Sequence, residues 1–277
     1  MALAFSKMHG AGNDFVLLDL RGGRAAPDAA TVRAIADRHT GVGFDQMLAV
    51  VDPKRRGSVA GYLIWNSDGS AAQQCGNGAR CVAAWLVRDG AASAGTRFTL
   101  DSPAGPIEVE CLPDGRYALD MGKPDFVPAH IPFRSTEQRA KYDWRERETT
   151  LRFGAASMGN PHALVEVEDV ARAPVAAQAT ALQHSGLFPQ GVNVGFAQVL
   201  SREAIRLRVV ERGVGETLAC GSGACAAVAI LVRQGKVDRR VDVQLPGGTL
   251  TIEWPDDAAT IRMSGPAAFV FEGEWER

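Results

Sequence analysis

The chain has 277 residues, of which 46% are hydrophobic and 22% charged, and its formal net charge is −2 at pH 7. These values are typical of a globular protein with one large or two modest domains, and they exclude the strongly basic balance of a nucleic-acid binder. The start, MALAFSKMHG, has no basic region followed by an apolar stretch, and no apolar run approaches the ~20 residues that cross a bilayer. We therefore expect a cytoplasmic protein without nucleic-acid or membrane partners.

Short apolar runs bounded by turn signals predict strands along most of the chain. In chain order these runs are FVLLDL (15–20), MLAVV (47–51), YLIW (62–65), RFTL (97–100), IEVE (107–110), ALVEV (163–167), IRLRVV (205–210), VDVQL (241–245) and LTIEW (250–254). After Cys75 and again after Cys220, apolar residues recur at i, i+3, i+4, i+7 and i+8, and each pattern ends near a glycine, Gly90 or Gly235. The sequence thus predicts an α+β fold with one central helix in each half.

The two helical segments resemble each other. CGNGARCVAAWLVRDG begins at Cys75, and CGSGACAAVAILVRQG begins 145 residues later at Cys220. Further matches pair GAGNDFVLLD (10–19) with SMGNPHALVE (157–166), GFDQML (43–48) with GFAQVL (195–200), IWNSDG (64–69) with VERGVG (210–215), and GPIEVE (105–110) with GTLTIE (248–253). A collinear series of this kind indicates an internal duplication.

The duplication predicts two pseudo-symmetric α/β domains, each a curved mixed β-sheet or barrel around its central helix. Residues 1–120, joined by the C-terminal residues 266–277, would carry Cys75, and residues 121–265 would carry Cys220, with the active site in the cleft between them. The tail contains the apolar run AAFVF, so we expect it to pair with an existing sheet. The mixed charges of RSTEQRAKYDWRERETT (134–150) predict a solvated excursion.

Two of the five cysteines are placed for chemistry. An odd number of cysteines argues against a disulfide framework, and the C-x5-C and C-x4-C spacings argue against zinc, so Cys81, Cys111 and Cys225 are interpreted as small buried hydrophobes. Cys75 and Cys220 begin helices, where unpaired N–H groups attract an anion and lower the pKa of a thiol. Two such thiols on one ligand would suit stereoinversion, in which a base removes a proton and an acid on the opposite face returns one.

At these residues the sequence resembles the diaminopimelate epimerase family. The segments that carry the resemblance are HGAGNDF (9–15), NSDG (66–69), QCGNGARC (74–81), GNPHA (159–163), GVNVGF (191–196) and ERGVGETLACGSGACA (211–226). It implies inversion of LL-2,6-diaminopimelate to meso-diaminopimelate, in lysine and peptidoglycan precursor biosynthesis, by a homodimeric enzyme that uses no cofactor and no metal.

The resemblance also implies roles for individual residues. Cys75 and Cys220 would be the two bases, and His162 and Glu211 would tune their thiols. The substrate would be bound by Asn13, Gln46, Asn66, Gly76, Asn77, Asn160, Asn193, Glu211, Arg212, Gly221 and Ser222. Amide side chains both donate and accept hydrogen bonds, which suits carboxylate and ammonium groups together, and a guanidinium can grip a carboxylate with two bonds.

Other interpretations remain open at this point. Taken singly, Asn13 and Asn160 could be turn residues, His162 a loop histidine, and Glu211–Arg212 an exposed pair of little energetic weight. The whole chain could be a related cofactor-independent racemase or isomerase with another substrate. It could also be a non-catalytic amino-acid-binding protein in which Cys75 and Cys220 form a redox-switch disulfide.

Overall fold

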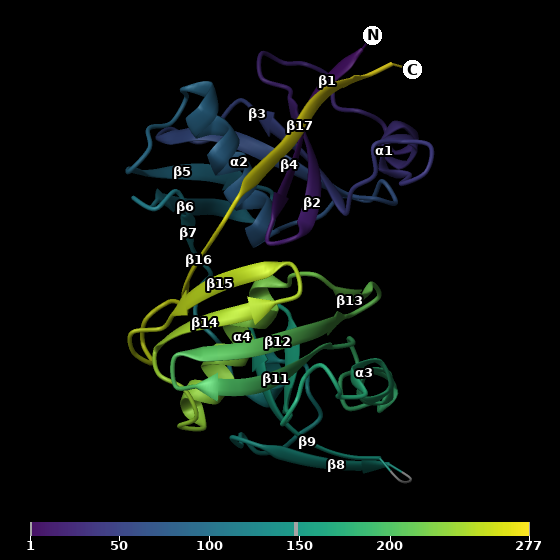
Figure 1. Ribbon diagram of the computed structural model, residues 1–277, viewed down its shortest axis with the longest axis vertical. Coiled ribbons are helices and arrows are strands. Elements are labelled where there is room, and N and C mark those ends of the chain that lie inside the picture. The colour runs from purple at the N-terminus through teal and green to yellow at the C-terminus, as the bar shows by residue number, and fades with distance from the viewer. Residues whose placement is uncertain (1, 147–148, 277) are drawn as a thin grey trace. The chain divides into compact units, whose positions relative to one another are not determined.

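The computed structural model describes residues 2–146 and 149–276, and the chain divides into two compact units (Figure 1). Unit 1 comprises Met1–Asp120 and Gly265–Arg277, and unit 2 comprises Met121–Ser264. None of the helices in the described ranges is long and apolar enough to span a membrane.

Unit 1 is built on a mixed sheet with the strand order β17-β1-β2-β3-β4-β5-β6-β7, in which the β2/β3 and β4/β5 pairs are parallel and the others antiparallel. Its elements are β1 (Leu3–Gly10), β2 (Asn13–Asp19), α1 (Ala29–Ala36), β3 (Gln46–Val51), β4 (Ser58–Asn66), α2 (Gly76–Asp89), β5 (Arg97–Ser102), β6 (Gly105–Cys111), β7 (Tyr117–Asp120) and β17 (Ala268–Trp275). The first strand of this order is the C-terminal segment, so the prediction that the tail pairs with an existing sheet is confirmed.

Unit 2 has the strand order β8-β9-β10-β11-β12-β14-β15-β16, with parallel pairs at β10/β11 and β12/β14. Its elements are the 3-10 helix η1 (Pro128–His130), β8 (Tyr142–Glu146), β9 (Thr149–Ser157), β10 (Pro161–Glu166), α3 (Val175–His184), β11 (Asn193–Ser201), β12 (Ala204–Glu211), β13 (Gly215–Thr217), α4 (Gly221–Arg233), β14 (Arg240–Leu245), β15 (Gly248–Glu253) and β16 (Arg262–Gly265). Strand for strand, the parallel and antiparallel pairs fall at the same places as in unit 1. The fold therefore repeats, as the sequence predicts.

Each sheet curves around its own central helix. Helix α2 contacts β1, β2, β3, β6 and β7, and helix α4 contacts β9, β10, β11 and β15. Most of the first ten residues of α2 are buried, and so are most of the first ten residues of α4. The second helix of each unit, α1 or α3, packs on the opposite side of the sheet in a separate apolar cluster. A strand-wrapped helix has its N-terminus fixed by packing on several sides, which makes it a rigid platform for side chains.

The ends of the central helices follow the sequence prediction. Cys75 and Cys220 are the N-cap residues of α2 and α4, and both have extended backbone angles. Helix α2 ends at Gly90, whose φ of 83° is the left-handed conformation that glycine adopts most easily. Both predicted helices, and their starts at the cysteines, are confirmed.

The interpretation of residues 134–150 as a wholly solvated excursion is wrong. Residues Tyr142–Glu146 form β8, which pairs with β9. The Tyr142 side chain is buried, with its ring 4.7 Å from that of Phe133 and 5.8 Å from that of Phe153. Charge dominates the composition of this stretch, but Tyr142 and, two residues on, the half-buried Trp144 pack on the apolar cluster of unit 2 and hold the strand on the core. Residues 147 and 148 lie outside the described ranges.

One sequence match between the halves also needs correction. Strand β3 lies beside β2 with Gln46 opposite Phe15, and β11 lies beside β10 with Asn193 opposite His162. The counterpart of Gln46 is therefore Asn193, and not Gln198 as the similarity of GFDQML to GFAQVL suggests. Strand pairing fixes equivalence here, because it determines which side chains point to the same side of the sheet.

Candidate active site

In unit 1 the start of β2 and the start of α2 bring three predicted residues together. The Cys75 thiol lies 3.6 Å from the Asn13 side-chain oxygen, and the Asn77 amide donates to that oxygen at 3.2 Å. The Cys75 sulfur also accepts from the backbone N–H of Gly78 at 3.4 Å. Asn13 is thus more than a turn residue, because its amide oxygen faces the thiol at the helix N-terminus.

Gln46 and Asn66 form a second contact in unit 1. They lie opposite each other on β3 and β4, and the Gln46 amide donates to the Asn66 oxygen at 3.0 Å. The Asn66 amide in turn donates to the Ser70 hydroxyl at 3.0 Å. These contacts fix both amides by neutral hydrogen bonds alone.

In unit 2 a buried histidine joins the corresponding cluster. His162 Nε2 lies 3.0 Å from the Asn160 side-chain oxygen and 3.1 Å from the Ser222 hydroxyl, which is 3.7 Å from the Cys220 sulfur. Burial, followed by the positive charge of Arg212, lowers the pKa of His162 to about 3. The imidazole is therefore neutral near pH 7, and because the Asn160 oxygen can only accept, its proton is assigned to Nε2.

Cys220 differs from the expectation that a helix start lowers the pKa of a thiol. Its pKa is raised well above the ordinary value, first by burial and then by the negative charge of Glu211. Hydrogen bonds from Gly223 N–H and Ser222 act in the opposite direction but do not compensate. A Cβ on Gly223 would lie 3.1 Å from the sulfur, so glycine allows this close approach. A pKa raised in this way makes Cys220 a thiol near neutral pH and hence a proton donor.

Glu211, Arg212 and Asn193 meet where β11 begins and β12 ends. The Asn193 side-chain oxygen accepts from the Arg212 backbone N–H at 2.9 Å, and the Arg212 guanidinium donates to the Gln190 carbonyl. The Arg212 side chain lies over Gly191, where a Cβ would come within 2.4 Å of it. Arg212 is exposed, as the sequence allows, and Glu211 is half-buried, but the two neighbours are engaged by different partners.

The predicted backbone donors are the first residues of the two helices. Gly76 and Asn77 open α2, and Gly221 and Ser222 open α4. The first N–H groups of a helix have no partner within it and bind anions well. Each unit therefore offers a thiol, an amide and helix-start N–H groups in one place.

Sequence reasoning missed three residues that support these groups. Asp45 accepts from the Asn13 amide at 2.8 Å, and the fully buried Arg80 donates to the Asn77 oxygen at 2.8 Å. Thr217 donates to Glu211 at 2.6 Å. Arg80 and Thr217 lie in the motifs that carry the resemblance, and Asp45 lies beside Gln46 in the repeated segment GFDQML, so their signal was a polar residue in such a segment without an assigned role.

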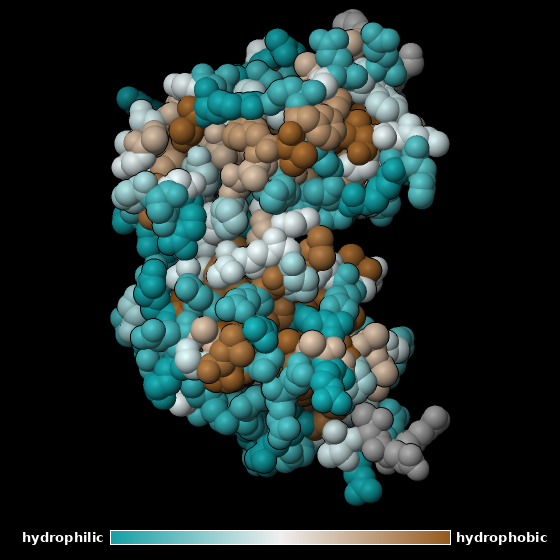
Figure 2. All heavy atoms as spheres, viewed as in Figure 1, coloured by the Kyte–Doolittle hydropathy of each residue, from teal (hydrophilic) through white to brown (hydrophobic). Residues whose placement is uncertain are grey.

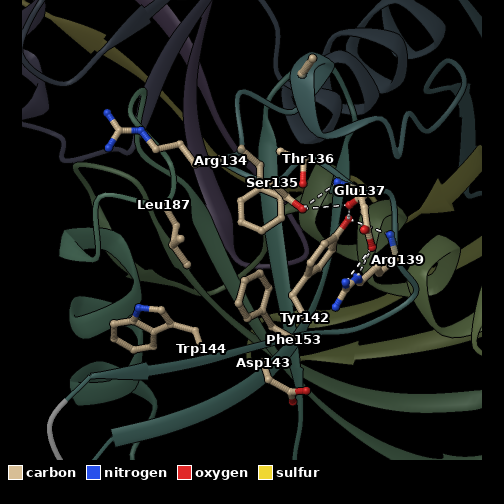
Figure 3. Close-up of a pocket in the computed structure, with 12 residues that line it drawn as sticks. Arg134, Ser135, Thr136, Glu137, Arg139, Tyr142, Asp143, Trp144, Phe153 and Leu187 are labelled. Carbon is tan, nitrogen blue, oxygen red and sulfur yellow. Dashed lines mark hydrogen bonds and ion pairs between the residues drawn. The ribbon is translucent and has the colours of Figure 1, made fainter.

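A separate hollow in unit 2 contains none of the predicted site residues (Figure 3). It has a volume of about 740 Å³, and its walls include Phe133, Tyr142, Trp144 and the ion pair of Glu137 with Arg139. Within residues 2–146 and 149–276, no group of three or more His, Cys, Asp or Glu side chains is placed to hold a metal ion.

The fold is shared with a known class of isomerases. A hydroxyproline epimerase from Agrobacterium vitis superposes with a TM-score of 0.69 at 16% identity, over 99% of this chain and 92% of that one. At this level of identity the likeness concerns the fold, which is that of the proline racemase and phenazine-biosynthesis type.

Comparison with known sequences identifies the family to which the chain belongs within this fold. The family model described as diaminopimelate epimerase matches residues 5–127 and 154–270. A diaminopimelate epimerase of Xanthomonas axonopodis pv. citri is 59% identical over 99% of this chain and 97% of its own length. An O-ureido-serine racemase of Streptomyces lavendulae is 56% identical over 98% of this chain and 94% of its own. The chain belongs to the diaminopimelate epimerase family and is an isomerase.

Proposed function

We propose that this protein interconverts LL- and meso-2,6-diaminopimelate without a cofactor, with Cys75 and Cys220 acting on opposite faces of one α-carbon. The observation that carries the proposal is that two equivalent thiols begin the central helices of two duplicated units. Stereoinversion needs one group to take the α-proton and another to supply a proton to the opposite face.

The reaction balances with these groups alone. A thiolate removes the α-proton, so the C–H bond breaks and its electron pair spreads onto the α-carboxylate. The opposing thiol gives its proton to the other face of the carbon and becomes the thiolate. The N–H groups of Gly76, Asn77, Gly221 and Ser222 would stabilise the charge that develops on the carboxylate, and the direction of reaction sets which sulfur begins as the base.

The remaining predicted residues would orient the substrate and tune the thiols. Asn13, Gln46, Asn66, Asn160 and Asn193 would bind its ammonium and carboxylate groups, and Arg212 a carboxylate. In this scheme Glu211 governs the protonation of Cys220, because its negative charge already raises the pKa of that thiol. His162, neutral and bonded to Ser222, would keep the helix start in position.

The first test is proton NMR of the reduced protein with LL-diaminopimelate in deuterium oxide. Wild type should lose the α-proton signal and produce the meso isomer. Cys75→Ala and Cys220→Ala should each lower the turnover number by roughly 10³-fold. Cys111→Ala is the matched control, because Cys111 is a buried cysteine on β6 outside the candidate site. The proposal is excluded if wild type leaves the α-proton untouched, or if Cys75→Ala and Cys220→Ala are as active as Cys111→Ala.

A second candidate substrate has a specific basis. The O-ureido-serine racemase of Streptomyces lavendulae has nearly the same identity to this chain as the diaminopimelate epimerases. Racemisation of an amino acid with a different distal group would use the same two thiols. The same NMR assay with O-ureido-serine separates the two, since one substrate should have the higher kcat/KM by at least tenfold.

We further propose a cytoplasmic homodimer in lysine and peptidoglycan precursor biosynthesis, and β17 is the strand suited to contact a second copy. Phe269, Val270 and Phe271 are 38%, 56% and 48% exposed, and hydrophobic surface gathers over β17 in Figure 2. An exposed apolar edge strand readily recruits another chain. Sedimentation velocity should give a dimer for wild type and a monomer for Val270→Lys, and a monomeric wild type would contradict this part.

A further inference from the structure

A threonine hydroxyl holds one oxygen of the Glu211 carboxylate. Thr217 Oγ1 donates to Glu211 Oε1 at 2.6 Å. In the β12/β13 hairpin, Val209 lies opposite Thr217 and Glu211 lies opposite Gly215. Glu211 and Thr217 are therefore diagonal neighbours on one face of the hairpin, within reach of each other's side chains.

The counterpart positions in unit 1 carry neither group. At the 145-residue spacing of the two cysteines, Asn66 corresponds to Glu211 and Ala72 corresponds to Thr217. Asn66 is bonded to Gln46 and Ser70 instead. The unit with the charged side chain, Glu211, thus has a hydroxyl donor at the Thr217 position. The unit with the neutral amide, Asn66, has a methyl group at the corresponding position, Ala72.

The contact has a physical consequence for Glu211. A carboxylate can rotate about its last bond, so a donor at one oxygen limits that rotation and leaves the other oxygen open to the Cys220 side. A hydrogen bond to a charged acceptor is short and strong, which makes it an effective restraint on the side chain. The carboxylate beside Cys220 is thereby held in orientation.

We propose that Thr217 is a positioning residue for the epimerase reaction, which holds the Glu211 carboxylate oriented beside Cys220. The inference rests on the proposed function for its kinetic consequences. Its structural content, a hydroxyl donor that restrains the carboxylate, does not depend on turnover.

The test compares Thr217→Val, which keeps the shape and removes the donor, with Thr217→Ser, which keeps the donor. Thr217→Val should lower kcat about tenfold and change KM less than twofold, because a charge-assisted hydrogen bond is lost from a group that does not carry the substrate. Thr217→Ser should retain kcat within about threefold. Thr249→Val, at an exposed position on β15, is the matched control and should behave as wild type.

A second measurement separates this inference from the proposed function. In protein labelled with 13C-glutamate, the carboxyl signal that disappears in Glu211→Gln belongs to Glu211. Its 13C chemical shift at a fixed pH should change in Thr217→Val and stay at the wild-type value in Thr217→Ser, whether or not the protein turns over diaminopimelate, because only the valine variant loses the hydroxyl donor. An unchanged kcat or an unchanged chemical shift in Thr217→Val would overturn the inference, and so would a Thr217→Ser variant as impaired as Thr217→Val.

Discussion

The two units share a backbone plan but differ in the chemistry around their cysteines. In unit 1 the residues at the β2, β3 and β4 positions beside the central helix are Phe15, Gln46 and Asn66. In unit 2 the corresponding positions hold His162, Asn193 and Glu211. At these three positions unit 1 therefore has neutral side chains, and unit 2 has an imidazole and a carboxylate.

The difference suggests how a duplicated fold can acquire two unlike acid–base groups. Strand order and helix starts are held by many packing contacts, so they persist while single polar side chains change. A pair of thiols that exchange roles needs one protonated partner at each stage, and burial, followed by the Glu211 charge, favours the protonated form of Cys220.

Removing the charge from unit 2 should have the largest effect. Glu211→Gln keeps the shape and an oxygen for the Thr217 hydroxyl, but it loses the negative charge beside Cys220. We expect kcat to fall by about 10²-fold, the scale of a lost acid–base partner. Steady-state kinetics with diaminopimelate measure it, with Gln198→Glu, on β11 outside the site, as a control for added charge. Activity within twofold of wild type would show that the asymmetry has no catalytic role.

Replacing the buried cation of unit 1 should mainly affect stability. Arg80 is 0% exposed and donates to Asn77 and to the Pro266 carbonyl. Arg80→Met removes donors from buried acceptors, so we expect a loss of about 3 kcal/mol in the free energy of unfolding. Urea denaturation measures this loss. The counterpart change in unit 2, Cys225→Ala, should cost about 1 kcal/mol. If the two substitutions lowered the free energy of unfolding equally, the buried cation would not distinguish unit 1 from unit 2.

His162 should make unit 2 sensitive to mild acid. Its pKa is lowered to about 3 by burial and Arg212, whereas an unfolded histidine titrates near 6.5. Unfolding therefore takes up a proton between these values, so this stabilisation is complete above pH 6.5 and decreases as the pH falls towards 3.

The variant that tests this linkage is His162→Phe, which introduces the unit 1 residue. Between pH 7.5 and 5.0 wild type should lose about 2 kcal/mol of unfolding free energy through His162, at about 1.4 kcal/mol per pH unit below 6.5. The variant should not show this loss. His39→Phe, at an exposed histidine, should keep the wild-type slope. An unchanged slope in His162→Phe would argue against a buried neutral imidazole.

The smallest effect should come from Asp45. Its carboxylate accepts from Asn13 and from Arg38, each at 2.8 Å, and these contacts are largely exposed. Asp45→Ala frees the Asn13 amide to reorient, so KM should rise about threefold while the unfolding free energy changes by less than about 1 kcal/mol. Asp143→Ala, at an exposed carboxylate paired with Arg152, is the control. A KM unchanged by Asp45→Ala would indicate that the Asn13 orientation does not depend on it.

Much of the fold could be predicted from the chain because it depends on local pattern. The apolar stripe after Cys75 and Cys220 specifies the central helices, and the glycines after them specify their ends. The predicted runs either alternate apolar and polar residues, as IEVE and VDVQL do, or consist of apolar residues, as MLAVV does. Each of them forms a strand in the structure. β8 was missed because charged residues surround Tyr142, so that no local pattern marks a strand there.

Candidate site residues divide in the same way. Asn13, Cys75 and Asn77 lie in recognisable motifs and meet in the structure, as do Asn160, His162 and Ser222. Sequence alone gave no reason to connect Thr217 with Glu211, Asp45 with Asn13, or Gln46 with Asn193. Those relations depend on strand register and on which face a side chain occupies, neither of which a linear motif records.

By itself, the sequence determined that the chain is duplicated, that two cysteines begin helices, and which family it resembles, since each of these is a matter of residue order and periodicity. Tertiary structure alone decided the protonation of the groups around those cysteines. A helix start favours a thiolate, yet burial and one carboxylate raise the pKa of Cys220, and burial leaves His162 neutral. Desolvation and proximity to charge are properties of the folded chain, and in unit 2 they outweigh the local effect of the helix.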